Sequence, residues 1–140
     1  MSVPKRKRVE EARDLLERAK EQLGRAQVAW WEPAEPADCV TNAFYAYENA
    51  LTAAVVAVGM KPTKQHYEKS VLAKRLFQEN RLKTDVSDLL KTLNEVRKDV
   101  QYGESGDQLR QVDLEELVTE LETFVGEVEA LLDEVEESYR

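Results

Sequence analysis

The feature that most constrains the fold is a stripe of apolar residues that recurs every three or four positions near the C-terminus. Its members are Leu114, Leu117, Leu121, Phe124, Val128, Leu131 and Val135, with Val118, Val125 and Leu132 as a second row beside it. Such spacing places the side chains on one face of an α-helix. We expect one long helix over about 109–138, whose apolar face packs against other helices of the same chain.

Four earlier segments show the same helical spacing. Their expected bounds are 5–30, 38–58, 63–80 and 84–102, with Asp38, Thr63 and Thr84 as expected N-caps of the last three. The expected buried side of the third segment consists of Tyr67, Val71, Leu72, Leu76 and Phe77. Only five glycines and four prolines are present, which leaves little material for the hairpin turns of a sheet. The sequence therefore predicts an all-α fold, an antiparallel bundle of about five helices.

The 140 residues are expected to form one domain, with a core over about 9–136 and a basic lead-in over 1–8. The run over residues 4–9 resembles a nuclear import signal, but a basic helix entry is the simpler interpretation. No apolar run approaches the ~18 residues of a membrane span, and the lead-in lacks the apolar stretch of a secretory signal. Since Cys39 is the only cysteine, we expect a reduced protein in the cytoplasm.

Charge is distributed unevenly along the chain. The net charge is −8, with a balance of −10 over residues 113–140 and of +5 over residues 61–98. The overall acidity disfavours non-specific binding of nucleic acid, but the basic middle is suited to holding a phosphate or an RNA strand. The acidic final helix either is a solvated face or docks a basic partner, and the solvated face is the favoured interpretation.

The residue types of most catalytic sites are missing. A single histidine and a single cysteine exclude a common zinc site within one chain. The sequence also contains no glycine-rich phosphate loop and no nucleophile elbow. We therefore expect neither a metal nor another cofactor.

The exception is a polar cluster at the end of the fourth expected helix. It runs Arg97-Lys98-Asp99-Val100-Gln101-Tyr102-Gly103-Glu104. On a regular helix Arg97 and Gln101 are about 40° apart and project together, whereas Arg97 and Tyr102 are about 140° apart. Tyr102 therefore reaches Arg97 only if the helix ends near Gln101, which Gly103 favours. The alternative is an ordinary capped helix end with Arg97 in a surface ion pair.

This cluster resembles the motif of the HEPN domains (higher eukaryotes and prokaryotes nucleotide-binding), which are small helical bundles. Their motif is an arginine, four to six residues of any type and a histidine, near the end of a late helix. Arg97 and Tyr102 match its spacing with tyrosine in place of histidine, as in a variant branch that has Tyr-Gly at this place. The aromatic and alanine-rich stretch 42–51 resembles the second helix of the family, and the resemblance covers about residues 10–135.

The resemblance implies a homodimer whose two motifs share one cleft. It also implies either a metal-independent ribonuclease or a non-catalytic nucleotide- or RNA-binding partner of a nucleotidyltransferase, in a toxin–antitoxin or antiviral defence module. By that analogy Arg97 contacts a phosphate, with Lys98, Gln101 and Tyr102 beside it. A tyrosine titrates near pH 10, about three units too high for a base at neutral pH. The sequence thus favours binding over catalysis and leaves enzymatic activity open.

Three residues outside the cluster have two interpretations each. His66, the only histidine, either supplies the missing imidazole to this site or lies at the surface near a helix start. Trp30 and Trp31 either stack on a nucleobase or fill the end of the bundle, and the second interpretation is favoured.

A different function also stays open, namely a non-catalytic interaction or oligomerisation module that uses the acidic final helix.

Overall fold

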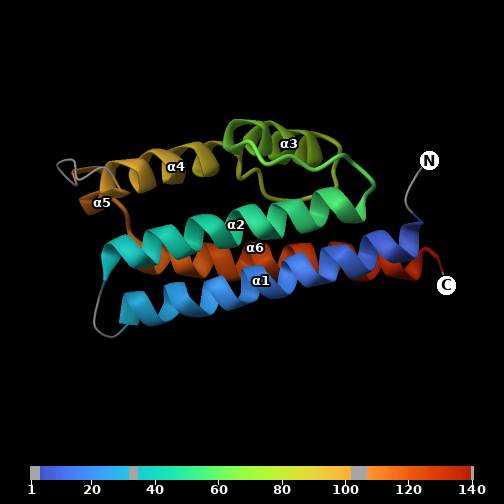
Figure 1. Cartoon of the computed structure of the whole chain (residues 1–140), viewed down its shortest axis with the longest axis horizontal. Coiled ribbons are helices and arrows are strands. Elements are labelled where there is room, and N and C mark those ends of the chain that lie inside the picture. Colours follow the sequence, from blue (N-terminus) through green and yellow to red (C-terminus); the bar gives the residue numbers. More distant parts are fainter. Residues whose placement is uncertain (1–3, 32–34, 102–106, 140) are drawn as a thin grey trace.

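The computed structural model describes residues 4–31, 35–101 and 107–139, and every regular element within them is a helix. The helices are α1 (Lys5–Trp31), α2 (Pro36–Ala57), α3 (His66–Gln78), α4 (Ser87–Gln101), α5 (Asp107–Arg110) and α6 (Leu114–Glu137). The long helices α1, α2 and α6 lie side by side, and α3 and α4 cover α2 on its other side (Figure 1). The predicted all-α fold is confirmed. Tyr102 lies outside the described residues.

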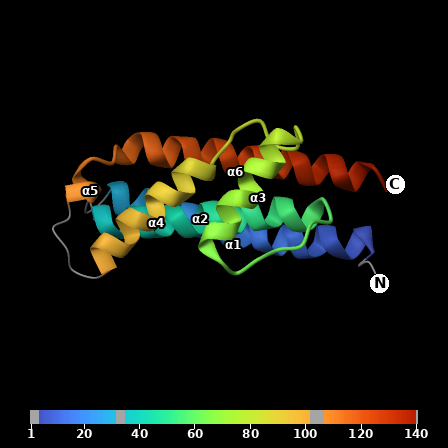
Figure 2. The ribbon, with the colours of Figure 1, turned by 90° about the horizontal axis from the view of Figure 1, so that it is seen from above.

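Helix α2 is the centre of the molecule because it contacts each of the other helices. Alanine occupies six of its buried positions, which allows neighbouring helices to approach closely. Larger side chains such as Phe44, Tyr47 and Leu51 fill the space between the layers. Gly59, with a φ of 82°, ends the helix as the sequence predicts, because this left-handed backbone suits glycine. Figure 2 shows α3 and α4 crossing over α2.

The apolar stripes of the first and last segments are confirmed as core. In α1 the buried residues are Val9, Ala12, Leu16, Ala19, Leu23 and Ala26. In α6 they are Leu117, Val118, Leu121, Phe124, Val125, Val128, Leu131, Leu132 and Val135. The single helix expected over 109–138 is wrong, however, since α5 and α6 are separate. Asp113 starts α6 by accepting a hydrogen bond from the backbone N–H of Glu116 at 3.0 Å.

The expected buried side of the third segment is wrong in part. Leu76 is buried and Leu72 is half-buried, but Tyr67, Val71 and Phe77 are 71%, 50% and 40% exposed. The physical reason is that α3 contacts only α2 and α4 among the described helices, so one of its sides is not covered by another of them. Small residues, Ser70 and Ala73, form the rest of its buried face.

The three expected N-caps are also wrong. Helix α2 begins earlier than expected, with Glu35 at the N-cap and Pro36 in the first position, so Asp38 lies within the first turn. Gln65 precedes α3, and the Thr63 hydroxyl accepts a hydrogen bond from its backbone N–H. Thr84 instead contacts α6, where its N–H and its hydroxyl donate to the carboxylate of Glu127.

Part of the acidic surface of α6 is used inside the bundle. Arg13 of α1 donates to Asp133 and Glu136 at 2.6 and 2.7 Å, and Lys20 forms an ion pair with Glu129. These acids therefore hold α6 against α1. None of the described helices combines the length and the apolar character that crossing a membrane requires.

Candidate functional site

Arg97 lies at the edge of the α2–α4 contact. The stripe of α4 places Leu90, Leu93 and Val96 in the core, which turns the next residue toward the rim. The half-buried guanidinium of Arg97 has its Cζ 5.2 Å from the centre of the Phe44 ring and 5.8 Å from that of Tyr45. Both distances are within the range of cation–π attraction. Two aromatic rings of α2 thus position this cation.

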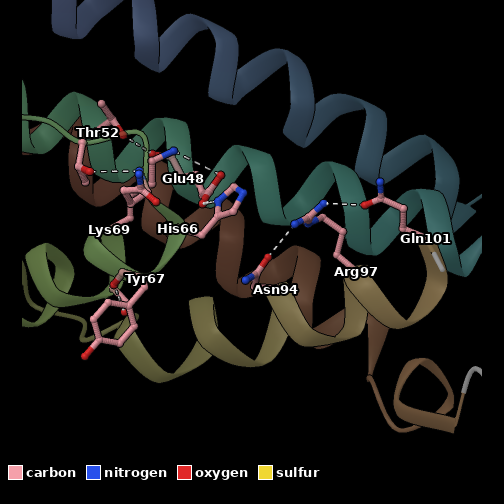
Figure 3. A network of polar contacts seen from close by, with 11 residues as sticks. Glu48, Thr52, His66, Tyr67, Lys69, Asn94, Arg97 and Gln101 are labelled. Atoms are coloured by element: carbon pink, nitrogen blue, oxygen red, sulfur yellow. Dashed lines mark hydrogen bonds and ion pairs between the residues drawn. The ribbon is translucent and has the colours of Figure 1, made fainter. Parts of the chain in front are cut away.

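The hydrogen bonds of Arg97 go to neutral oxygens of its own helix. Nη1 donates to Oε1 of Gln101 at 3.0 Å, and Nη2 donates to Oδ1 of Asn94 at 2.8 Å (Figure 3). Its Nε is buried and has no hydrogen-bond partner among the residues that the structure describes. The expected alternative of a surface ion pair is wrong for the part of the chain that the structure describes, where no carboxylate lies within ion-pair distance of Arg97. Within these residues the positive charge of Arg97 has no carboxylate partner.

A small cleft opens beside this guanidinium. It has a volume of about 270 Å³ and is lined by Thr41, Tyr45, Arg97, Val100 and Gln101. Sites that enclose a drug-sized ligand commonly measure about 300–1,000 Å³. The cleft is therefore of a size for a phosphate and part of its sugar. A guanidinium also offers two parallel N–H donors that match phosphate oxygens.

His66 lies on the same side of α2, at the first position of α3 (Figure 3). Its Nδ1 is 2.5 Å from Oε2 of Glu48, a buried carboxylate of α2. Nζ of Lys69 is 3.5 Å from the other oxygen of Glu48. The imidazole ring also lies 5.4 Å from the Phe44 ring, centre to centre. His66 and Arg97 are thus neighbours of one aromatic side chain, although 31 positions separate them in the sequence.

The structure brings one of the other expected site residues to Arg97 and leaves another apart from it. Gln101 joins Arg97, as expected from their spacing. Lys98 does not, because it is exposed and its Nζ lies 3.8 Å from Oε1 of Glu95. Of the two tryptophans, Trp30 packs partly against the core, but Trp31 is 70% exposed, so the bundle-end interpretation is wrong for Trp31.

Four residues of the site were missed by sequence reasoning. The sequence could have indicated Asn94, because it precedes Arg97 by three positions and Gln101 by seven, which places all three on one side of a helix. The sequence could also have indicated Glu48, because it is a carboxylate within an apolar, alanine-rich segment. No sequence feature could have indicated the roles of Phe44 and Tyr45, because core packing and cation contact require the same residue types.

Comparison with known proteins places the chain in a family. A family model described as HEPN domain matches residues 12–138, nearly the whole chain. The chain belongs to the HEPN domain family. A search of the curated proteins and a search of the solved structures found no match. As an HEPN domain the chain has a nucleotide- or RNA-related function.

Proposed function

We propose that this HEPN domain binds a nucleotide or an RNA strand through a phosphate held by Arg97. The observation that carries the proposal is the guanidinium held between two aromatic rings and two amide oxygens beside an open cleft. Each Nη nitrogen has two hydrogens and gives one to an amide, so one hydrogen on each remains for a ligand. Among the described residues Arg97 has no carboxylate partner, so its charge is left for an anion.

The charge of the surroundings supports an anionic ligand. The segment 61–98, which forms α3 and most of α4, has a balance of +5. The acidic residues concentrate in α6, whereas α3 and α4 cover the other side of α2 (Figure 1). A positive field on the layer that holds the cleft raises the local concentration of an anion.

Tyr102 and Gln101 complete the proposed binding set. Gln101 lines the cleft and accepts from Arg97, which leaves its amide N–H groups for a ligand. Tyr102 follows directly at the end of α4, and a phenol there is suited to donating to a phosphate oxygen or stacking on a base. We assign both residues to binding.

We further propose that the domain acts as a homodimer with a nucleotidyltransferase partner, in a toxin–antitoxin or defence-type module. The family resemblance suggests this role, and the uncovered side of α3 supports a protein contact. Tyr67, Val71 and Phe77 leave exposed apolar surface there. Light scattering of the pure protein tests the dimer, and co-purification with a nucleotidyltransferase encoded beside it tests the partner.

Fluorescence anisotropy with a labelled single-stranded RNA tests the binding proposal. Arg97→Ala is expected to weaken binding about 10-fold or more, because a charge-assisted contact contributes ~1.5–3 kcal/mol. Arg97→Lys is expected to bind with intermediate affinity, since lysine keeps the charge but not the planar donors. Arg18→Ala, which removes an exposed arginine of α1, is the matched control. Equal affinity of wild type and Arg97→Ala, or no binding of RNA or nucleotide by wild type, would exclude the proposal.

A further inference from the structure

Another cavity lies at the end of the bundle where α1 begins and α6 ends. Its volume is about 390 Å³, which is within the ~300–1,000 Å³ of sites that hold small molecules. Figure 1 shows this end of the bundle opposite the end that carries α5 and the last turn of α4. Ala57 lines this cavity and Tyr45 lines the Arg97 cleft, and along α2 they are about 18 Å apart. The cavity is therefore separate from the Arg97 cleft.

Basic side chains from two parts of the chain meet at this cavity. Lys5 and Arg8 come from the first turn of α1, and Arg81 comes from the connection between α3 and α4. Glu134 of α6 is the one acid among the lining residues that the structure describes. Three cations around one cavity repel one another, and an anion between them replaces this repulsion with attraction.

Gly59 makes room for the guanidinium of Arg8 beside the end of α2. A Cβ atom at position 59 would lie 3.3 Å from Cζ of Arg8, which is closer than ordinary van der Waals contact. Arg8 is half-buried, so the backbone at Gly59 restricts where its side chain lies. The guanidinium of Arg8 is thus held at the wall of the cavity.

Lys5 and Arg81 keep hydrogen-bond donors for a ligand. Nζ of Lys5 donates to Oγ of Ser138 at 2.9 Å, which leaves two of its hydrogens. Arg81 is exposed, and its side chain forms no ion pair within the part of the chain that the structure describes. The first turn of α1 also contains no acidic residue. The positive end of the α1 dipole therefore adds to the charge of Lys5 and Arg8.

We propose that this cavity binds a short polyphosphate chain, either as a free oligophosphate or as part of a larger molecule. Guanidinium and ammonium donors match phosphate oxygens, and two or three linked phosphates carry enough negative charge to meet three cations. The described part of the lining contains no aromatic ring on which a base could stack. The phosphate chain is therefore the group that the cavity recognises. The proposal does not depend on Arg97, and it gives a role to the basic start of α1.

Isothermal titration calorimetry of the full-length protein with sodium triphosphate tests the site. The titrations are made at constant ionic strength. Arg81→Ala is expected to weaken triphosphate binding about 10-fold or more, because it removes a charge-assisted contact. Arg18→Ala, which removes an exposed arginine of α1 outside the cavity, is the matched control. Arg97→Ala is expected to bind triphosphate within about 2-fold of wild type, because the two sites are separate.

A substitution of Glu134 tests the site in the opposite direction. Glu134→Gln removes the negative charge from the described lining, so we expect triphosphate to bind about 2- to 5-fold more tightly. Glu122→Gln removes the same charge from an exposed position of α6 outside the cavity and is expected to leave the affinity unchanged. Equal effects of the two variants would mean that triphosphate responds only to the overall charge, which overturns the site.

ATP distinguishes the two sources of the phosphate chain. We expect ATP to bind no more tightly than triphosphate, because the described lining offers nothing to a base. A gain of more than about 3-fold for ATP overturns recognition of the phosphate chain alone.

The other outcomes also decide the proposal. Absence of triphosphate binding by wild type overturns it, and so does binding that Arg97→Ala abolishes and Arg81→Ala keeps. Binding of RNA that depends on Arg97 is measured separately, so the failure of one proposal leaves the other in place. Circular dichroism checks that each variant is folded, and an unfolded Arg81→Ala is replaced by Lys5→Gln, for which a loss of triphosphate affinity is also expected.

Discussion

The guanidinium of Arg97 lies over the ring of Phe44, with Cζ 5.2 Å from the ring centre. Phe44 is 1% exposed and belongs to the core of α2, whereas Arg97 is at the rim of α4. A buried ring therefore serves as the base on which a cation is presented to solvent. Because His66 contacts the same ring, the fold brings the only imidazole of the chain to this cation.

Phe44→Leu is expected to weaken RNA binding about 2- to 10-fold, because the cation–π contact contributes ~0.5–2 kcal/mol to holding Arg97. The smaller side chain also leaves a void, and we expect the free energy of unfolding to fall by about 1–2 kcal/mol. Anisotropy and urea denaturation measure the two effects. Phe77→Leu on the exposed side of α3 is the control. A loss of stability with unchanged affinity would show that Phe44 does not position Arg97.

Asn94→Asp places a carboxylate where Arg97 now donates to a neutral amide. We expect RNA affinity to fall about 3- to 10-fold, because the new ion pair neutralises the cation and competes with the phosphate. Asn94→Ala removes the same hydrogen bond without adding a charge, and its loss is expected to be smaller. Anisotropy at low salt compares the two variants. An affinity of Asn94→Asp equal to that of Asn94→Ala would contradict the argument.

The stripes of α1, α4 and α6 were predictable because burial on one helix face repeats every three or four residues. The exposure of one side of α3 was not predictable, since Tyr67 and Val71 have helical spacing whether or not another element covers them. The predicted N-caps were wrong for a different reason. Thr84 has the side chain of a cap, but Glu127, 43 positions away, is its partner, and local sequence does not reveal such a contact.

Glu127→Ala is expected to lower the free energy of unfolding by about 1–3 kcal/mol. Its carboxylate accepts from the backbone N–H groups of Lys83 and Thr84 and from the Thr84 hydroxyl, so it ties the connection between α3 and α4 to α6. Glu122→Ala, at an exposed position of the same helix, is expected to change stability by less than about 0.5 kcal/mol. Guanidinium denaturation compares the two variants, and equal losses would contradict the tether.

Cys39 is expected to be unreactive toward a thiol reagent at pH 8 in the folded protein and reactive after denaturation. Its side chain is fully buried, and burial raises the pKa of the thiol to about 11. Between its ordinary pKa and this value the folded state binds the extra proton. The free energy of unfolding is therefore expected to fall as pH rises through this window, by up to about 1.4 kcal/mol per pH unit. Rapid labelling of the folded protein would contradict the burial.

Within the candidate site, only the contact between Arg97 and Gln101 was predictable from the sequence. The spacing of Arg97 and Gln101 on one helix was sufficient to pair them, and the structure confirms their contact at 3.0 Å. The position of His66 was not, because α3 meets α2 through packing that no local pattern specifies. Of the two interpretations that the sequence left open for His66, the structure confirms the position at a helix start, and the role in the Arg97 site stays a prediction.

The salt dependence of RNA binding tests the phosphate contact of Arg97 most directly. For a single strand, each phosphate contact contributes about −0.7 to the slope of the logarithm of the association constant against the logarithm of salt concentration. Arg97→Ala is predicted to reduce the magnitude of the wild-type slope by about 0.7, with weaker binding at low salt, while Arg18→Ala leaves the slope unchanged. The same slope and affinity for wild type and Arg97→Ala would contradict the assignment of Arg97 as the residue that holds the phosphate.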